Sequence, residues 1–594
     1  MEKSGDEKED TETEGDAAAG EDFSIIDQVS PIIKPDVNVD SMLAYAGDFG
    51  RYQILLMVLF SMVNVFSAFH YFAQTFITIE PENFRCAMLA ENDHENDDNF
   101  YGLVNAGRPG NETRPQSPDK CKEFNLDLVE FVENNNDTQR NTVWKLEDCQ
   151  KFKYDKDFGY ESIVTELEWV CNKSWKAAIG QSMYFVGSVF GTFLLGIAAD
   201  SWGRTKALVI AFLFAIFGNT MTIFSYDLEL FAVARFIAGL ATDTNFVMMY
   251  IIVMEYVRPS MRTFGLNVCI GIFYCLGCSV VPWLAVALQT WRRFLVAVSV
   301  GMILTPFYYF ILPESASWLL TQGRVDEALK GFQRIAKING KTIPDEVIVT
   351  FKEVHENDDK PPKAAICELF RTPKLRRKMC ILIFKTMTLT LCYDAISRNV
   401  NVNGASPFLV FSLGSLTIFP AGIVILLLQD KIGRKALFFL AVLMSAFLTS
   451  SCGLMNAFVK NTTVLSQQTI VRLSVGLTVT ARLCVVVAFN SGSQYAAELI
   501  PTVIRGRGVA LIHVVGYAAS FMSPLILYLS KYWLPLPDLL LSTLCFVCAA
   551  VTLLLPETLG KTLPVTVKDG EEFGENERPC DFVCCGAGRD QNRN

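Results

Sequence analysis

Charged residues are scarce in this chain of 594 residues: Asp, Glu, Lys and Arg make up 19% of it, whereas 51% of the residues are apolar or aromatic. Soluble domains carry about 25% charged residues, so this deficit and the positive mean hydropathy of +0.29 argue against a soluble globular protein. The chain also lacks a GxxxxGK phosphate loop, a GxSxG nucleophile elbow and a convincing cluster of metal ligands. These absences argue against an ATP-driven pump and against an enzyme.

The first 24 residues lack any apolar run, and no aromatic residue precedes Phe23. They are rich in acidic residues, a composition typical of disordered segments. Because they contain no hydrophobic core of a signal peptide, we expect the first membrane-spanning helix to act as the insertion signal.

Long apolar stretches are abundant. A bilayer core needs about 20 apolar residues of helix, and the chain has twelve such stretches. They lie near 53–77, 177–198, 205–226, 230–256, 264–287, 292–312, 377–398, 405–429, 435–457, 468–496, 508–530 and 533–556. The predicted fold class is an all-α membrane protein with twelve transmembrane helices.

Two long polar segments divide these stretches into two groups of six. We expect a disordered acidic N-terminus over 1–45, a six-helix bundle over 46–312 with a polar insert over 78–176, a linker over 313–376, a second six-helix bundle over 377–556, and a tail over 557–594. Basic residues favour the loops on the side of the linker, although Arg292 and Arg293 depart from this pattern. Positive loops face the cytoplasm, so we expect both termini, the linker and the tail there, and the insert outside the plasma membrane.

The insert has two features of an extracellular segment. It contains an even number of cysteines, Cys86, Cys121, Cys149 and Cys171, which suits two disulfides in an oxidising compartment. Spacing alone does not fix how they pair. Glycosylation sequons begin at Asn111, Asn136 and Asn172, and a fourth begins at Asn461 in a later loop predicted on the same side.

Two short motifs occur once in each half of the chain. The first motif is Asp-x-x-Gly-Arg, formed by Asp200, Gly203 and Arg204 and again by Asp430, Gly433 and Arg434. The second is a Glu followed seven residues later by an Arg, formed by Glu255 and Arg262 and again by Glu498 and Arg505. The glycine suits a tight turn, and charges of both signs can pair across a seam that opens and closes. Parallel six-helix repeats around a midplane site are the plan of major facilitator transporters.

Several segments resemble the organic cation, carnitine and organic anion transporter family, over about residues 40–560. They are GDFGRYQ (47–53), the cysteine-bearing insert, ESIVTELEWVC (161–171), LPESASWLLTQGRVDEA (312–328) and FNSGSQYAAELIPTVIR (489–505). Ser317 stands where the family usually has arginine, and Ser493 where it usually has tyrosine. The resemblance implies a twelve-helix fold, a central cavity and alternating access, with cations, zwitterions or anions as substrates.

Two carboxylates inside apolar stretches are candidates for substrate binding, because charges there are costly. Asp394 lies in the seventh stretch, and the alternative to substrate contact is an i,i+4 ion pair with Arg398; the two roles can coexist. Asp243 lies twelve residues before Glu255, which places it about 18 Å along the fourth helix. For Asp243 the alternative is an interhelical hydrogen-bond cluster.

Other candidates follow partly from the resemblance. Cation carriers of the family have an acidic residue about seven residues before the proline of the eleventh helix, and anion carriers have an arginine at this position. In this chain the position is occupied by Tyr517. Tyr517 offers a cation–π face, and Tyr393 is suited to line an aromatic cavity; packing is the alternative for both. Arg482 aligns with a basic position common in the family, where a structural or gating role is the alternative to substrate contact.

Two further ionisable residues have plainer interpretations. Lys385 is expected to snorkel to the cytoplasmic surface. His70 is expected to be a satisfied core residue rather than a proton relay.

Together, the two carboxylates favour a transporter of organic cations or amine-bearing zwitterions, carnitine-like or derived from amino acids. An organic anion is the alternative substrate, and a ligand sensor that moves nothing is the alternative from another class. The expected partners are the solute and the lipid bilayer, without nucleic acid, metal or cofactor. The sequence leaves open the oligomeric state and any coupling to sodium or protons.

Overall fold

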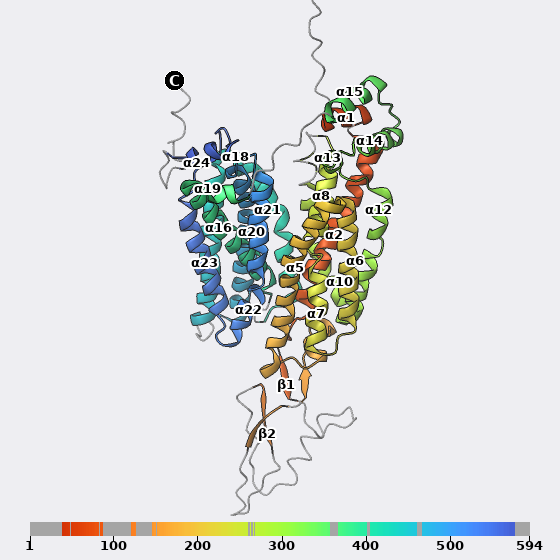
Figure 1. Cartoon of the computed structure of the whole chain (residues 1–594). Helices are drawn as coiled ribbons and strands as arrows, with labels where there is room; N and C mark the ends of the chain where they lie inside the picture. Colours follow the sequence, from red (N-terminus) through yellow and green to blue (C-terminus); the bar gives the residue numbers. More distant parts are fainter. Residues whose placement is uncertain are drawn as a thin grey trace, which may run out of the picture.

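The structure is a computed structural model in which α-helices predominate (Figure 1). It describes residues 38–47, 49–81, 83–86, 120–125, 145–149, 151–258, 262, 265, 268–356, 366–400, 404–459, 466–575 and 582. Of the predicted glycosylation sites, Asn111, Asn136 and Asn461 lie outside these residues.

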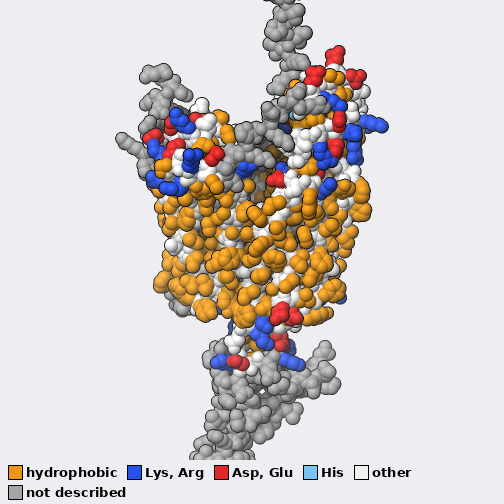
Figure 2. Space-filling model, in the orientation of Figure 1, with side chains coloured by type: hydrophobic (Ala, Val, Ile, Leu, Met, Phe, Trp, Pro, Cys, Tyr) orange, Lys and Arg blue, Asp and Glu red, His pale blue; other side chains and the backbone are white. Residues whose placement is uncertain are grey.

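Within the described residues, eleven helical segments are long and apolar enough to cross a membrane, and a shorter apolar helix occupies the twelfth predicted stretch. The helices of the first six stretches are α2 (Arg51–Ile77), α5 (Trp175–Trp202), α6 (Arg204–Ile223), α7 (Leu228–Gly239) with α8 (Thr244–Tyr256), η3 (Ile270–Tyr274) with α10 (Cys275–Leu288), and α11 (Trp291–Met302) with η4 (Thr305–Phe307) and α12 (Tyr308–Ile311). Those of the last six are α16 (Pro373–Arg398), α17 (Pro407–Leu416) with α18 (Ile418–Ile432), α19 (Arg434–Leu454) with η6 (Met455–Val459), α20 (Gln467–Leu499), α21 (Arg505–Ser520) with α22 (Ser523–Tyr528) and η7 (Leu529–Lys531), and the shorter α23 (Leu536–Thr552). On the face that Figure 2 shows, an apolar band covers these helices, with charged side chains gathered at its two ends.

The helices form two bundles that stand side by side (Figure 1). We call α2 to α12 the N-terminal bundle and α16 to α23 the C-terminal bundle. Each has its own apolar core, with Phe60 and Phe212 in the first and Phe438 and Leu541 in the second. The bundles touch where α5 meets α21 and α22, and where α10 meets α17.

Glycines let α5 pack very closely on α7. A Cβ atom added at Gly187 would lie 2.1 Å from the carbonyl oxygen of Phe236, and one at Gly191 would lie 2.0 Å from that of Leu240. Small residues at helix interfaces allow such close backbone approach in membrane proteins. The end of α7 is therefore fixed firmly against α5.

Among the described residues, four of the spans are interrupted. The fourth breaks between α7 and α8 at residues 240–243, the sixth between α11 and η4 at residues 303–304, the eighth at Thr417, and the eleventh between α21 and α22, just before Pro524. Broken helices within spans are typical of transporter binding sites, because irregular backbone at membrane depth is tolerated where protein or a cavity surrounds it.

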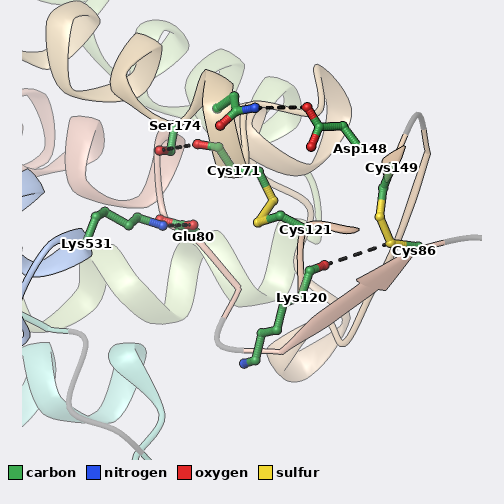
Figure 3. Close-up of a disulfide and its surroundings, with 10 residues drawn as sticks. Glu80, Cys86, Lys120, Cys121, Asp148, Cys149, Cys171, Ser174 and Lys531 are labelled. Carbon is green, nitrogen blue, oxygen red and sulfur yellow. Dashed lines mark hydrogen bonds and ion pairs between the residues drawn. A yellow bond between two sulfur atoms is a disulfide. The ribbon is translucent and has the colours of Figure 1, made fainter. Parts of the chain in front are cut away.

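The insert between α2 and α5 contains two short antiparallel sheets. Strand β1 (Phe84–Cys86) pairs with β4 (Phe152–Tyr154), and β2 (Lys122–Asn125) pairs with β3 (Lys145–Asp148). The structure links the four cysteines as Cys86–Cys149 and Cys121–Cys171 (Figure 3). Asn172, the one predicted glycosylation site among the described residues, donates from Nδ2 to Asp148 Oδ2 at 3.3 Å.

The segment that ends the insert anchors it on the N-terminal bundle. The 3₁₀ turn η1 (Asp157–Gly159) leads to α4 (Ile163–Glu166), and η2 (Cys171–Lys173) leads into α5. The carboxylate of Glu166 accepts hydrogen bonds from Trp291 Nε1 at 2.6 Å and from Arg292 Nη2 at 2.8 Å, both on α11. Arg292 departed from the loop-charge pattern, and this bond gives it a structural role.

The opposite end of the molecule carries short helices outside the spans. They are α1 (Val39–Ala46), α13 (Ala316–Thr321), α14 (Val325–Asn339), α15 (Asp345–Glu356), η5 (Ile366–Phe370) and α24 (Val567–Glu572). Apolar residues recur along one face of α14, including Leu329, Phe332 and Ala336, and are buried there. Asn339 at its end donates to the backbone carbonyl of Gly47 at 2.9 Å, which ties the linker to the start of the N-terminal bundle.

Candidate functional site

Asp243 lies at the break in the fourth span. It is the residue before α8, so its side chain projects from irregular backbone rather than from a continuous helix. Ser188 on α5 donates to Asp243 Oδ2 at 3.1 Å, and Tyr517, on the helix α21 that packs against α5, lies close to this carboxylate. Asp243 is therefore placed between the two bundles, since Ser188 belongs to one and Tyr517 to the other.

The charge of Asp243 is not balanced by an ion pair. Among the described residues no Lys, Arg or His side chain lies within 4.0 Å of its carboxylate. The side chain is partly exposed, and buried oxygens of Thr242 and Asn245 beside it have no hydrogen-bond partner. The site thus offers an acceptor-rich carboxylate without a counter-ion, which is suited to an ammonium group.

Asp394 has a different environment. It is fully buried on α16, and its Oδ1 accepts from Arg398 Nε at 2.8 Å, so the i,i+4 ion pair considered as the alternative is present. The same oxygen accepts from the Tyr71 hydroxyl at 2.7 Å, whereas Oδ2 has no partner. The role of Asp394 in substrate contact stays a prediction.

Arg398 connects the two bundles. Its Nη1 donates to Thr75 Oγ1 at 2.8 Å and its Nη2 to the backbone carbonyl of Tyr71 at 3.1 Å, both on α2. Its guanidinium also lies over the ring of Phe185 on α5, 5.1 Å from the centroid. We call Asp394, Arg398, Tyr71 and Thr75 the interbundle cluster.

The two predicted tyrosines lie between the bundles as well. Tyr393 stacks on Phe489, with ring centroids 5.0 Å apart, and lies close to Tyr274. Tyr517 lies close to Tyr393 and Tyr274 and stacks on His513, with centroids 6.5 Å apart. An aromatic cluster therefore lies next to Asp243.

Arg482 on α20 is buried. Its guanidinium lies 4.9 Å from the ring centroid of Phe411, with Nη1 3.4 Å from the backbone carbonyl of that residue and Nη2 3.4 Å from Ser415 Oγ. Of the five predicted substrate residues, the structure places Asp243 and Tyr517 close to each other, and Tyr393 lies close to Tyr517, Asp394 and Arg482.

The prediction for Lys385 is wrong. Its ammonium does not reach the surface but donates to the carbonyl of Gly492 at 2.6 Å, with the rings of Phe438 and Tyr495 around it. The reason is that α16 is packed on all sides, so a side chain twelve residues after Pro373 has no lipid-facing route along which to snorkel.

His70 is satisfied as predicted. Its Nε2 lies 2.9 Å from the carbonyl oxygen of Ala238, and its Nδ1 lies 3.3 Å from the side-chain nitrogen of Asn219. Asn219 in turn accepts from Arg235 at 3.0 Å, so the histidine is part of a buried hydrogen-bond network.

The first copy of the duplicated motifs forms a compact turn. Gly203 has a φ of 110°, and the carboxylate of Glu314 accepts from the backbone nitrogens of Arg204 at 2.6 Å and Thr205 at 3.0 Å. Arg204 pairs with Asp200 at 2.6 Å. Negative charge at the beginning of α6 is favourable because free N–H groups point there.

The second copy repeats this geometry. Gly433 has a φ of 97°, and Glu557 accepts from the backbone nitrogens of Arg434 at 3.0 Å and Lys435 at 3.2 Å. Arg434 pairs with Asp430 at 3.0 Å and with Glu498 at 3.4 Å.

The remaining motif residues bind within their own bundle or to segments attached to it. Glu255 accepts from the hydroxyl of Ser315 at 2.7 Å, and Glu498 accepts from that of Thr558 at 2.5 Å. Arg262 pairs with Asp40 on α1, and Arg505 donates to the carbonyl of Ile500 at 3.3 Å. Each of these ion pairs of the motif residues joins residues of the same half of the chain, not residues across the seam.

Sequence reasoning missed several of these partners. Glu314 and Glu557 had a signal, because Leu-Pro-Glu-Ser (312–315) and Leu-Pro-Glu-Thr (555–558) repeat after the sixth and twelfth stretches. Tyr71, Thr75 and Ser188 had none, because they are common residue types at positions that only the packing of α2 and α5 brings to the site.

The sequence and the fold were compared with those of known proteins. The family described as "Sugar (and other) transporter" matches residues 128–566. The chain belongs to this family. It is a multi-pass membrane transporter of the major facilitator type.

Its relatives extend over almost the whole chain. The organic cation transporter-like protein of Drosophila melanogaster is 27% identical over 552 residues, covering 91% of this chain and 93% of the relative. The organic cation/carnitine transporter 2 of Mus musculus is 28% identical over 539 residues, covering 89% and 93%. A partially occluded inward-open structure of the xylose transporter XylE from E. coli shares the fold, with a TM-score of 0.51, 12% identity and coverage of 86% of this chain and 100% of XylE.

The glycines of the duplicated turns give a first testable prediction for this transporter. A Cβ atom at Gly203 would lie 2.3 Å from Glu314 Oε2, and one at Gly433 would lie 2.4 Å from Glu557 Oε2. Alanine at either position also has to adopt a positive φ, which costs about 1–3 kcal/mol. We expect Gly203→Ala and Gly433→Ala each to lower the melting temperature of the purified protein and its rate of solute uptake.

The matched control is Gly196→Ala. Gly196 lies on α5 near the same turn, and nothing lies within 4 Å of a Cβ atom added there. If Gly203→Ala melts at the same temperature as Gly196→Ala, the turn does not need its glycine.

Proposed function

We propose that this transporter carries small organic cations or amine-bearing zwitterions across the plasma membrane by alternating access. The relatives named organic cation and carnitine transporters support this substrate class. In this proposal all twelve apolar segments span the membrane as two six-helix repeats, both termini and the linker are cytoplasmic, and the disulfide-linked, glycosylated insert is extracellular.

The environment of Asp243 is the observation on which the proposed charge of the substrate rests. It is partly exposed at a helix break between the bundles, and no cationic partner lies within ion-pair distance among the residues described. A positively charged solute would supply the missing charge, with Tyr517 and the neighbouring Tyr393 providing aromatic faces. Because Asp394 already has Arg398 as its cation, Asp243 is the better first contact for an ammonium group.

Alternating access is supported by where the bundles are bonded. The interbundle cluster lies towards the insert end of α16, and closer still to the insert Lys531 pairs with Glu80, as Figure 3 shows. At the opposite end, the duplicated motifs make their ion pairs within their own halves. We assign this arrangement to a state closed on the extracellular side, in which the bonds between the bundles must break when the outside opens.

An organic anion is the second candidate. Arg482 and Lys385 are both buried, and neither has a carboxylate within ion-pair distance in the part of the chain that the structure describes. Buried cations without a counter-ion favour a negatively charged solute in the same way that Asp243 favours a positive one.

Uptake into cells separates these candidates. Labelled organic cations, amine-bearing zwitterions and organic anions would be offered to cells with the transporter at their surface, with and without sodium, at two pH values and two membrane potentials. We expect cations or zwitterions to accumulate, and the ion dependence to define any coupling. Uptake of anions alone would reverse the substrate assignment, and binding without uptake would identify a sensor.

A further inference from the structure

Arg482 has unused hydrogen-bonding capacity although it is buried. Its side chain is 3% exposed, its two contacts are both 3.4 Å long, and its Nε has no partner. A guanidinium has five N–H donors and is costly to bury unless anions or acceptors surround it. The rings of Phe411 and Phe72 cover its faces, with centroids 4.9 and 6.0 Å away, but they accept no charge.

A second orphan donor faces the same pocket. Ser397 and Arg482 both line a small pocket between α16, α17 and α20, and the buried Oγ of Ser397 has no hydrogen-bond partner. Asn399 also lines it, and its Nδ2 donates to Asp538 Oδ1 at 3.0 Å, so this acid is linked to the lining without being part of it. Two unpaired donors and a positive charge at one pocket are the chemistry of an anion site.

The size of the pocket limits the ligand. The cavity volume is about 10 Å³, which is room for about one water-sized group and far below the 300–1,000 Å³ of typical pockets for whole organic ligands. Gly414 allows the close approach that forms it, since a Cβ atom there would lie 2.6 Å from Arg482 Nη1. The space therefore excludes a whole organic solute and suits a group of about the size of a water molecule, such as one carboxylate oxygen or a halide.

We infer that the pocket of Arg482 and Ser397 binds one small monovalent anion during transport. The inference rests on the proposed function in one respect, because the anion is either the carboxylate of a zwitterionic substrate whose ammonium is held near Asp243, or a free chloride that accompanies a cation. Arg482 donates to the anion through Nε and Nη, and Ser397 donates through Oγ. No covalent step is involved.

The test compares two solutes that differ only in the anionic group. In butyltrimethylammonium a methyl group replaces the carboxylate of γ-butyrobetaine. Uptake of each would be measured in chloride medium and in methanesulfonate medium, for the wild type, Arg482→Gln and Ser397→Ala. Arg472→Gln is the matched control, since Arg472 is exposed on the same helix.

Three results are distinguishable. If the anion is the substrate carboxylate, Arg482→Gln lowers γ-butyrobetaine uptake about tenfold more than it lowers butyltrimethylammonium uptake, and chloride has no effect. If the anion is chloride, wild-type uptake of both solutes falls in methanesulfonate and Arg482→Gln abolishes this sensitivity. If Arg482→Gln changes neither the carboxylate preference nor the chloride dependence, the inference is overturned.

A binding measurement keeps the inference testable apart from transport. The melting temperature of the purified full-length protein would be compared in sodium chloride, acetate and methanesulfonate at equal ionic strength. We expect chloride or acetate to raise it for the wild type and Arg472→Gln but not for Arg482→Gln, because a ligand that binds only the folded state stabilises it. If the wild type imports neither solute but shows this shift, the proposed function fails and the anion site stands; identical melting temperatures for the wild type in all three salts overturn the anion site.

Discussion

Asp243→Asn should lower the uptake of organic cations about ten- to a hundredfold while the protein still reaches the cell surface. An ionised carboxylate bound to an ammonium group contributes about 1.5–3 kcal/mol, and every 1.4 kcal/mol is a factor of ten. Asn keeps the size of the side chain and its bond to Ser188 but removes the charge. The measurement is the initial rate of uptake against concentration, normalised to surface protein.

Glu229→Gln is the matched control. Glu229 lies on α7 in the same span but is exposed at its outer end, so the same loss of one negative charge is expected to leave uptake within about twofold. Equal uptake by Asp243→Asn and the wild type would show that the carboxylate does not contact the substrate, and that the polar patch around it is an interhelical hydrogen-bond cluster.

The same variant also tests the sign of the substrate. For an organic anion, Asp243 is a repulsive charge near the path, so Asp243→Asn would raise uptake or leave it unchanged. Tyr517→Phe adds a second test. It removes the hydroxyl near Asp243 but keeps the ring, so a cation that uses the ring through cation–π contact retains most of its affinity.

The membrane fold could be predicted because its determinants are local. Apolar length defines a span, and the positions of the duplicated Asp-x-x-Gly-Arg motifs define the two halves; both are visible in a single sequence. The positive φ of Gly203 and Gly433 follows from the same motif, since a helix that ends and restarts within one residue needs a conformation that glycine adopts readily.

The chemistry of the site is harder to predict from the sequence than the fold is. The i,i+4 spacing of Asp394 and Arg398 indicates that this charge can be paired, but the contacts of the pair with Tyr71 and Thr75 on α2 are not visible in the sequence. The position of Asp243 at a helix break and close to Tyr517 follows only from the packing of the helices. Lys385 was misplaced for the same reason, since snorkelling depends on which side of α16 faces lipid.

Arg398→Gln should destabilise this transporter more than alanine at either Gly203 or Gly433. It leaves the buried Asp394 without its cation and removes two bonds to α2, those to Thr75 and Tyr71. Removing one partner of a buried ion pair costs about 3–5 kcal/mol. We expect low surface expression and a strongly reduced melting temperature for the purified protein, and a similar loss for Asp394→Asn.

The double variant Arg398→Gln/Asp394→Asn separates the two roles of Asp394. With both charges absent, no buried charge is left unpaired. The double variant should therefore lose much less stability than the sum of the two single losses. The control is Arg324→Gln, which breaks an ion pair with Glu327 in which the side chains are 45% and 50% exposed, and which should cost at most about 1 kcal/mol. Strictly additive losses would mean that the pair contributes nothing as a pair. If the double variant regains both stability and uptake, Asp394 serves only the interbundle cluster; if it regains stability but not uptake, Asp394 also contacts the solute, and the transport cycle exchanges its partner between Arg398 and the ammonium group.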